Sequence, residues 1–92
     1  MHQIEWTTQA YSDLQRFYDF LAPINSQAAI QILNMLATAP EKLINNPRIG
    51  ENLPEFSPRE VRKLIVSRYE LRYEVKNNTI YILKLWHVRE NR

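Results

Sequence analysis

The sequence predicts an α+β fold in which a helical hairpin packs on a mostly antiparallel sheet of four strands. Three observations predict it. In residues 10–36 apolar side chains recur every three or four positions, which is the period of a helix that faces a core. From residue 61 onward the period falls to two, which is typical of half-buried strands. A chain of 92 residues supports one hydrophobic core, so we expect a single domain over residues 1–92.

A short strand and a helix come first. Residues 2–6 alternate polar and apolar side chains, as a strand does. The hydroxyl of Thr7 or Thr8 can accept a hydrogen bond from the first amides of a helix that begins near Gln9 and stops at Pro23. The apolar stripe expected to face the core is Ala10, Leu14, Phe17, Tyr18 and Leu21, and the charged residues off it are Asp13, Arg16 and Asp19.

A second helix is predicted after Pro23, antiparallel to the first. Asn25 or Ser26 can cap it, and its apolar positions are Ala29, Ile32, Leu33 and Leu36, with Leu43 extending the pattern. Pro40 predicts either a kink or a new short turn that begins near it. Residues 46–60 are expected to form an irregular connection, in which Gly50 ends the helical part.

Three strands follow, at residues 61–66, 69–76 and 80–86. Ser67-Arg68 and Asn77-Asn78 suit tight turns, because asparagine tolerates the positive φ that two-residue hairpins require. The last strand is almost continuously apolar, so we expect it inside the sheet, with the first strand on its free edge. The predicted order of the four strands is 1-4-3-2.

Charge is unevenly distributed along the chain. Residues 1–46 carry two Lys/Arg and four Asp/Glu, whereas residues 47–92 carry ten and six. A basic C-terminal half suggests an anionic partner, and solvated sheet faces are the alternative explanation. The N-terminus has no secretion signal and no stretch is apolar enough to span a membrane, so we expect a cytoplasmic protein.

Nothing in the sequence indicates a metal or a cofactor. It contains no cysteine, and His2, Glu5 and His87 cannot be joined into a recognisable metal-binding spacing. A glycine-rich phosphate loop and a Ser-His-Asp pattern are also missing. Trp6 and Trp86 lie within predicted strands and are expected to be structural rather than to stack on bases.

The order of these elements resembles the RelE/ParE toxin superfamily. The matching residues are Trp6, Ala10, Leu14, Ala29, Leu36, Leu43, Pro47, Gly50, Arg62, Leu64, Tyr69, Leu71, Tyr73, Ile82, Leu83, Trp86, His87 and Arg89, spread over almost the whole chain. The resemblance implies a two-layer α+β fold and the toxin of a type II toxin–antitoxin pair. It also implies a cognate antitoxin as partner, within a toxin–antitoxin hetero-oligomer.

The residues favour the ParE-like branch of this superfamily. RelE-like members cut messenger RNA on the ribosome and usually carry an arginine directly after the first tyrosine of the Tyr-x-Leu-x-Tyr strand. Here that position is Glu70, whose carboxylate would repel a phosphate. The ending Trp86-His87-Val88-Arg89 resembles ParE-like chains, which poison DNA gyrase by binding and are not enzymes. The resemblance therefore implies DNA gyrase as the target.

Two alternatives stay open. The first is a RelE-like ribonuclease that acts on ribosome-bound messenger RNA, with His87, Arg72 and Arg89 as its catalytic residues. The second is a degenerate family member that binds an antitoxin without being toxic, since the sequence ends three residues after Arg89.

Basic residues of the C-terminal half are the predicted contacts for the target or the antitoxin: Arg62, Arg72, His87, Arg89 and Arg92. On one face of the sheet, Arg62, Arg72 and Arg89 would offer guanidinium groups that grip carboxylates or phosphates with two hydrogen bonds each. The alternative is that they pair with Glu70 and Glu74 across strands. For His87, the simpler interpretation is a hydrogen bond to its neighbours at the end of a strand.

Overall fold

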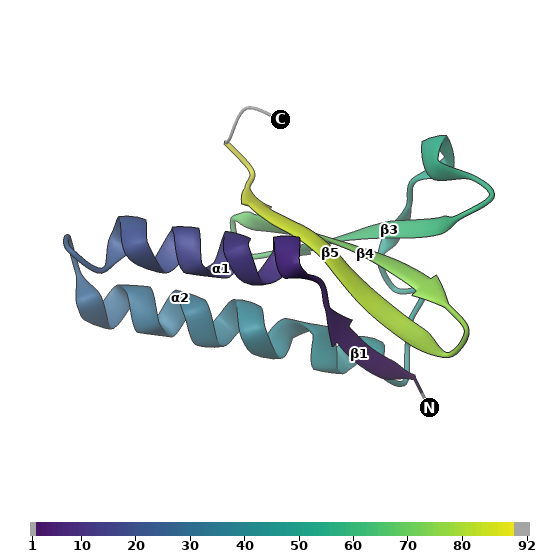
Figure 1. Cartoon of the computed structure of the whole chain (residues 1–92), viewed down its shortest axis with the longest axis horizontal. Coiled ribbons are helices and arrows are strands. Elements are labelled where there is room, and N and C mark those ends of the chain that lie inside the picture. Colours follow the sequence, from purple (N-terminus) through teal and green to yellow (C-terminus); the bar gives the residue numbers. More distant parts are fainter. Residues whose placement is uncertain (1, 90–92) are drawn as a thin grey trace.

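The computed structural model describes residues 2–89 and has two layers, with both helices on one side of a five-stranded sheet (Figure 1). The strands are β1 (Gln3–Trp6), β2 (Glu51–Asn52), β3 (Glu60–Val66), β4 (Tyr69–Lys76) and β5 (Thr79–His87). The helices are α1 (Thr8–Leu21) and α2 (Ser26–Thr38), with two short 3₁₀ turns, η1 (Ala39–Leu43) and η2 (Pro54–Phe56). The predicted α+β class and helical hairpin are confirmed.

The sheet has the order β1-β5-β4-β3-β2. The β1 strand runs parallel to β5, and all other neighbours are antiparallel. The predicted order holds for the four strands expected from the sequence, and β2 adds a fifth beside β3. Only two residues form β2, which is too short for an alternating pattern to reveal it. Asn77 and Asn78 have φ of 52° and 62° in the β4–β5 turn, which is the conformation predicted for them.

Side chains cap both helices where the sequence predicted caps. The Thr7 hydroxyl accepts a hydrogen bond from the Ala10 amide at 3.2 Å. The Asn25 side-chain oxygen accepts one from the Ala28 amide at 3.0 Å. Pro40 lies in the first turn of η1, so the second of the two expectations for this proline, a new short turn, is the one confirmed.

Gly50 does not end a helix, which corrects the prediction. The helical part ends at Leu43, and Gly50 does not have a positive φ. A Cβ at position 50 would come within 2.6 Å of the Tyr73 hydroxyl and 2.7 Å of the Lys63 carbonyl oxygen. Glycine is therefore required because two other parts of the chain approach its backbone closely.

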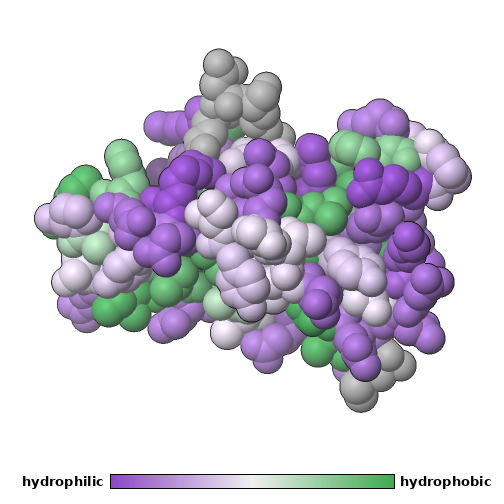
Figure 2. Space-filling view, in the orientation of Figure 1, coloured by the Kyte–Doolittle hydropathy of each residue, from purple (hydrophilic) through white to green (hydrophobic). Residues whose placement is uncertain are grey.

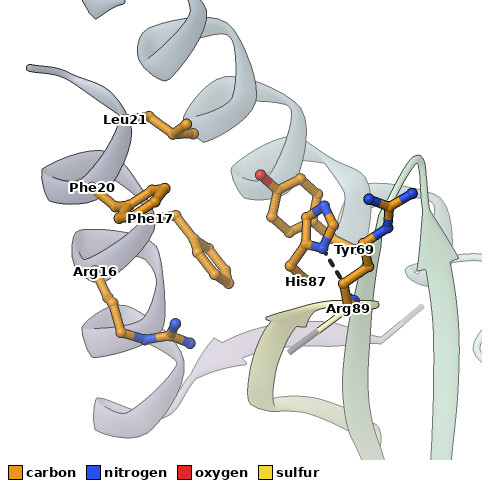
Figure 3. A pocket seen from close by; sticks show the side chains of 7 residues that line it. All are labelled: Arg16, Phe17, Phe20, Leu21, Tyr69, His87 and Arg89. Atoms are coloured by element: carbon orange, nitrogen blue, oxygen red, sulfur yellow. Dashed lines mark hydrogen bonds between the residues drawn. The ribbon is translucent and has the colours of Figure 1, made fainter. Parts of the chain in front are cut away.

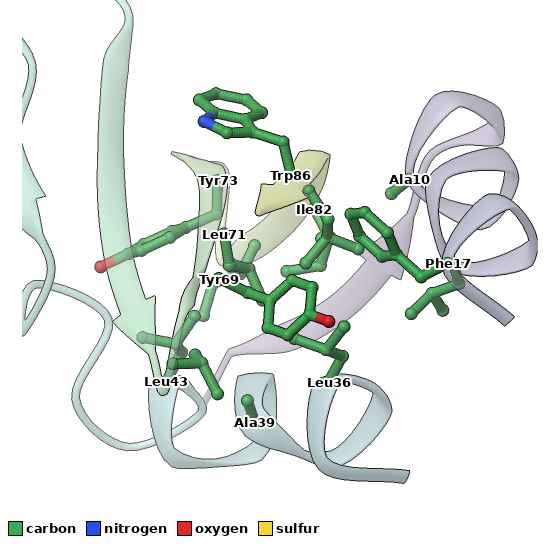
Figure 4. Packing of buried hydrophobic residues seen from close by; sticks show 14 residues of the cluster. Ala10, Phe17, Leu36, Ala39, Leu43, Tyr69, Leu71, Tyr73, Ile82 and Trp86 are labelled. Atoms are coloured by element: carbon green, nitrogen blue, oxygen red, sulfur yellow. The ribbon is translucent and has the colours of Figure 1, made fainter. Parts of the chain in front are cut away.

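The core lies between the helices and the sheet (Figure 4). Its fully buried members include Leu36, Leu43, Leu71, Tyr73, Ile80, Ile82 and Leu85. The Tyr73 hydroxyl donates to the Pro47 carbonyl at 2.7 Å and accepts from the Gly50 amide at 3.0 Å. Burial raises the pKa of Tyr73, so the hydroxyl stays protonated and can donate this bond at neutral pH.

Asp13 is buried, although the helical pattern placed it off the apolar stripe. Its exposed fraction is 3%, and its Oδ2 accepts a hydrogen bond from the Leu85 amide at 2.9 Å. The β1 strand pairs with β5 only as far as Ile82, so α1 lies against the edge of β5 beyond that point. The carboxylate thus satisfies a strand amide that β1 does not reach.

Two carboxylates on the sheet are held by arginines. Arg59 donates two hydrogen bonds to Glu74, at 2.9 and 3.2 Å, which lower the pKa of Glu74 although burial acts the other way. At Glu60 burial would raise the pKa, but hydrogen bonds from Arg62 and Arg48 outweigh it and the pKa falls. Both carboxylates therefore favour the folded state when they are ionised.

We expect the protein to lose stability in acid for this reason. Because the folded pKa values of these glutamates lie below the unfolded ones, their stabilisation is complete above roughly pH 4.3 and is lost as the pH falls further, through the folded values. Urea midpoints measured at several acidic pH values should depend less on pH for Glu74→Gln than for the parent protein. Identical pH dependence of the two proteins would contradict the prediction.

Candidate functional site

A groove lies between the second half of α1 and the end of the sheet where β4 begins and β5 ends (Figure 3). Its volume is about 800 Å³. The residues that line it are Arg16, Phe17, Phe20, Leu21, Tyr69, His87 and Arg89. Among the described residues that line it, three are basic and none is acidic, and the other four offer aromatic or aliphatic surface. This combination suits an amphipathic ligand with negative charge.

One side of α1 supplies four of the lining residues. Arg16, Phe17, Phe20 and Leu21 fall at positions i, i+1, i+4 and i+5, which share one side of a helix. Phe17 reaches into the core and is only 8% exposed, whereas Phe20 is 71% exposed. An aromatic ring this exposed is available to a partner, and Figure 2 shows further apolar surface along the two helices.

Aromatic contacts fix the opposite wall. The rings of Phe17 and Tyr69 meet edge to face with centroids 5.0 Å apart, and those of Tyr69 and His87 do so at 5.1 Å. His87 Nδ1 accepts a hydrogen bond from the Arg89 amide at 3.1 Å. The simpler prediction for His87, a hydrogen bond to a neighbour at the end of a strand, is therefore confirmed.

Arg16 stands at the rim of the groove beside a buried carboxylate. Its guanidinium lies 4.6 Å from the centroid of the Phe17 ring, and its Nη2 lies 3.6 Å from Oδ1 of Asp13. The Arg16 side chain is about half exposed, so it remains accessible to a ligand while Asp13 orients it. Arg16 and Arg89 thus place two guanidinium groups on one groove.

The predicted cationic face with three arginines is wrong. Arg62 pairs across the strands with Tyr73, the residue that follows Arg72. Paired residues share a face of the sheet and successive residues alternate, so Arg62 and Arg72 lie on opposite faces. Of the predicted binding residues that the structure describes, only His87 and Arg89 line the groove. Arg92 lies outside the described residues.

Arg72 belongs to the face that the helices leave uncovered. Its guanidinium lies 5.3 Å from the centroid of Phe56 and 4.7 Å from that of Trp86, and its Nη2 lies 3.5 Å from Glu70. Arg72 thus does pair with Glu70, but both residues belong to β4, so the expected pairing across strands is wrong for this arginine. Glu70 is 1% exposed, which the alternation of the strand did not predict.

Arg62 has a structural role on the helix side of the sheet. Its Nη1 donates to the Gly50 carbonyl at 2.8 Å and its Nε to Glu60 at 3.0 Å. It therefore pairs with Glu60 and not with the predicted Glu70 or Glu74, because strand alternation separates it from both. These contacts hold the chain before β2 against β3 and occupy the guanidinium.

Sequence reasoning missed Arg16, Phe20 and Tyr69 as groove residues. Arg16 lies off the apolar stripe of its helix, and Tyr69 lies on the apolar face of an alternating strand, so neither pattern indicated a binding residue. One signal was available: Phe20 and Leu21 are consecutive, so the apolar side of this helix is wider than the stripe that the core needs. Trp86 is 3% exposed, as predicted, and Trp6 is partly buried and stacks on Tyr11.

Within residues 2–89, no three His, Asp or Glu side chains come together in a way that could bind a metal ion. None of the helices in that range has the length and hydropathy needed to cross a membrane.

Two known proteins are similar to this chain over almost its whole length. The structure titled "Chromosomal ParDE TA system from P. aeruginosa" matches with a TM-score of 0.79 and 23% identity, over 95% of this chain and 96% of that one. At that identity the match establishes the fold. Toxin RelE2 of Caulobacter vibrioides is 30% identical over 87 residues, which are 95% of this chain and 96% of that protein.

The class of protein is therefore a small α+β toxin with the RelE/ParE fold. Residues 4–92 match the family described as ParE toxin of the type II toxin–antitoxin system, parDE. The chain belongs to this family, so an antitoxin is its expected partner.

Proposed function

We propose that this toxin acts by binding DNA gyrase and holding it on DNA, and that its antitoxin prevents this by occupying the groove. One observation carries the choice of a binding mechanism: the residues proposed for RNA cleavage do not lie together. His87 pairs with Tyr69, three residues before Arg72 in β4, so His87 and Arg72 belong to opposite faces of the sheet.

Cleavage of RNA at a 2′-hydroxyl needs a base, an acid and cations around a single phosphate. With Arg72 on the far face and next to the buried Glu70, this set would be incomplete around His87. The groove instead offers the exposed ring of Phe20 and two arginines, which suit recognition of another protein. These features support inhibition by binding.

The antitoxin is proposed to place an acidic, amphipathic segment in the groove. Apolar side chains of that segment would pack on Phe17 and Phe20, and its carboxylates would pair with Arg16 and Arg89. A segment that folds as it binds loses conformational entropy, which buried apolar contacts with rings such as these can offset. The toxin would then be masked while the complex persists.

A supercoiling assay tests the proposed target. Purified gyrase is incubated with relaxed plasmid and increasing amounts of toxin, with and without an excess of the antitoxin. We expect supercoiling to fail and cleaved plasmid to accumulate after denaturation of the protein, and we expect antitoxin to restore the reaction. Normal supercoiling at high toxin excess would argue against gyrase as the target.

A ribosome-dependent ribonuclease is the second candidate, and one observation favours it. Arg16 joins His87 and Arg89 at the groove, so an imidazole and two guanidinium groups do meet there. Primer extension on messenger RNA from a translating extract would then show new, codon-positioned ends that His87→Ala removes. If neither assay responds and induction leaves growth unaffected, the non-toxic alternative is the one supported.

A further inference from the structure

We propose that Asp13, which is not among the residues lining the groove, is a positioning residue for partner binding. Its buried carboxylate joins α1 to the edge of β5 and also holds Arg16 at the rim. This inference rests on the proposal that the groove binds the antitoxin.

The edge of β5 changes partner along its length. As far as Ile82 it pairs with β1. At the junction, the Thr7 hydroxyl donates to the Ile82 carbonyl at 2.7 Å, and the Thr7 amide donates to the same oxygen at 3.1 Å. Beyond it, Asp13 Oδ2 accepts from the Leu85 amide. Two side chains at the start of α1 thus replace β1 as the neighbours of β5.

The other carboxylate oxygen of Asp13 lies between Gln9 and Arg16. Its Oδ1 accepts a hydrogen bond from Gln9 Nε2 at 3.0 Å and lies 3.6 Å from Arg16 Nη2. Arg16 and Phe17 are three and four residues farther along the same side of the helix. Through its two oxygens, the Asp13 carboxylate therefore connects β5, which ends at His87, with the part of α1 that forms the other wall of the groove.

This link controls both the width and the charge of the groove. The Leu85 amide that Asp13 holds is two residues before His87, so the contact fixes the distance between the helix wall and the sheet wall. A buried amide that loses its acceptor is costly, so the helix would shift if the carboxylate were removed. Without the negative charge, Arg16 would also sample more rotamers at the rim.

Two substitutions of Asp13 separate its contact with the Leu85 amide from its contact with Arg16. In Asp13→Asn the amide oxygen can still accept from Leu85, but an NH₂ group replaces the oxygen beside Arg16. In Asp13→Ala both contacts are lost. Arg16→Gln, Arg89→Gln and the double variant Asp13→Asn/Arg16→Gln complete the set. For each folded variant, the affinity for the purified cognate antitoxin and the hydrogen-exchange rate of the Leu85 amide are measured.

For Asp13→Asn we expect near-parental exchange at Leu85 but an affinity about 3- to 10-fold weaker. In the Arg16→Gln background the same change should cause no further loss, because Asp13 acts on binding through Arg16. For Asp13→Ala, if it folds, exchange at Leu85 should be about tenfold faster or more. A purely structural role would instead make affinity follow stability, with Asp13→Asn binding as tightly as the parent protein.

The variant Arg89→Gln distinguishes failure of the role proposed for Asp13 from failure of the groove as the antitoxin-binding site. If Arg89→Gln weakens antitoxin binding while Asp13→Asn does not, the groove is the partner surface and the role proposed for Asp13 is wrong. If none of the variants, Arg89→Gln included, changes the affinity, the antitoxin does not use the groove, and both proposals are overturned. Additive losses for Asp13→Asn and Arg16→Gln would also contradict the link between these two residues.

Discussion

Replacing Gly50 with alanine is expected to lower the free energy of unfolding by about 2–4 kcal/mol, although the change adds a single methyl group. The new Cβ would lie 2.6 Å from the Tyr73 hydroxyl oxygen and 2.7 Å from the Lys63 carbonyl oxygen. The carbonyl belongs to β3 and cannot move without disturbing the sheet. Any shift of Gly50 would also stretch its hydrogen bond to the Tyr73 hydroxyl.

Urea denaturation of Gly50→Ala, Tyr73→Phe and the double variant measures this effect. Tyr73→Phe alone should cost about 1–3 kcal/mol, because the Gly50 amide and the Pro47 carbonyl lose a partner. It also removes one of the atoms that the methyl group would strike, so the double variant should be less destabilised than the sum. Glu51→Ala, at the exposed neighbouring position, is the matched control and should change stability by no more than about 0.5 kcal/mol. A Gly50→Ala protein as stable as this control would show that the close approach is not a constraint.

Reversing the charge of the groove should weaken antitoxin binding by about a hundredfold or more. In Arg16→Glu/Arg89→Glu both guanidinium groups become carboxylates, which turns two proposed attractions into repulsions with an acidic segment. A hundredfold loss corresponds to about 2.8 kcal/mol, which two lost attractions and two new repulsions can supply together. Calorimetry with the purified antitoxin, at two salt concentrations, measures both the affinity and its electrostatic part.

Lys76→Glu/Lys84→Glu is the matched control for this variant. It changes the net charge by the same amount, but both lysines alternate with residues that face the helices and therefore lie on the other face of the sheet. The control should bind antitoxin within about threefold of the parent protein, since only long-range electrostatics change. Equal losses for the two double variants would indicate a general charge effect and would remove the groove from the proposal.

Local patterns were sufficient to predict the elements and most of their ends. The Thr7 and Asn25 caps, the turn at Asn77-Asn78 and the new turn at Pro40 each depend on the chemistry of a few adjacent residues. Features of this kind depend only on residues that lie close together in the sequence. The two-residue β2 strand was missed because its pairing with β3 comes from the tertiary fold.

The candidate site was predicted only in part, because its walls come from segments far apart in the chain. His87 and Arg89 were expected to contact a partner, and they line the groove. Arg72 was grouped with them by residue type, yet the alternation of β4 places it on the other face. Phe20 and Arg16 complete the groove from α1, and no local pattern relates them to the end of β5.

Periodicity, caps and turns are local properties, so they were enough to predict the fold class. The order of the long strands followed from the apolar character of the last strand, and the toxin superfamily from residues matched along the chain. The tertiary structure decided which charges are buried and which side chains meet. Asp13 is buried because β1 ends before β5 does, and that difference in strand length leaves an amide for a helix side chain to satisfy. Such a requirement arises only when helix and strand are packed together.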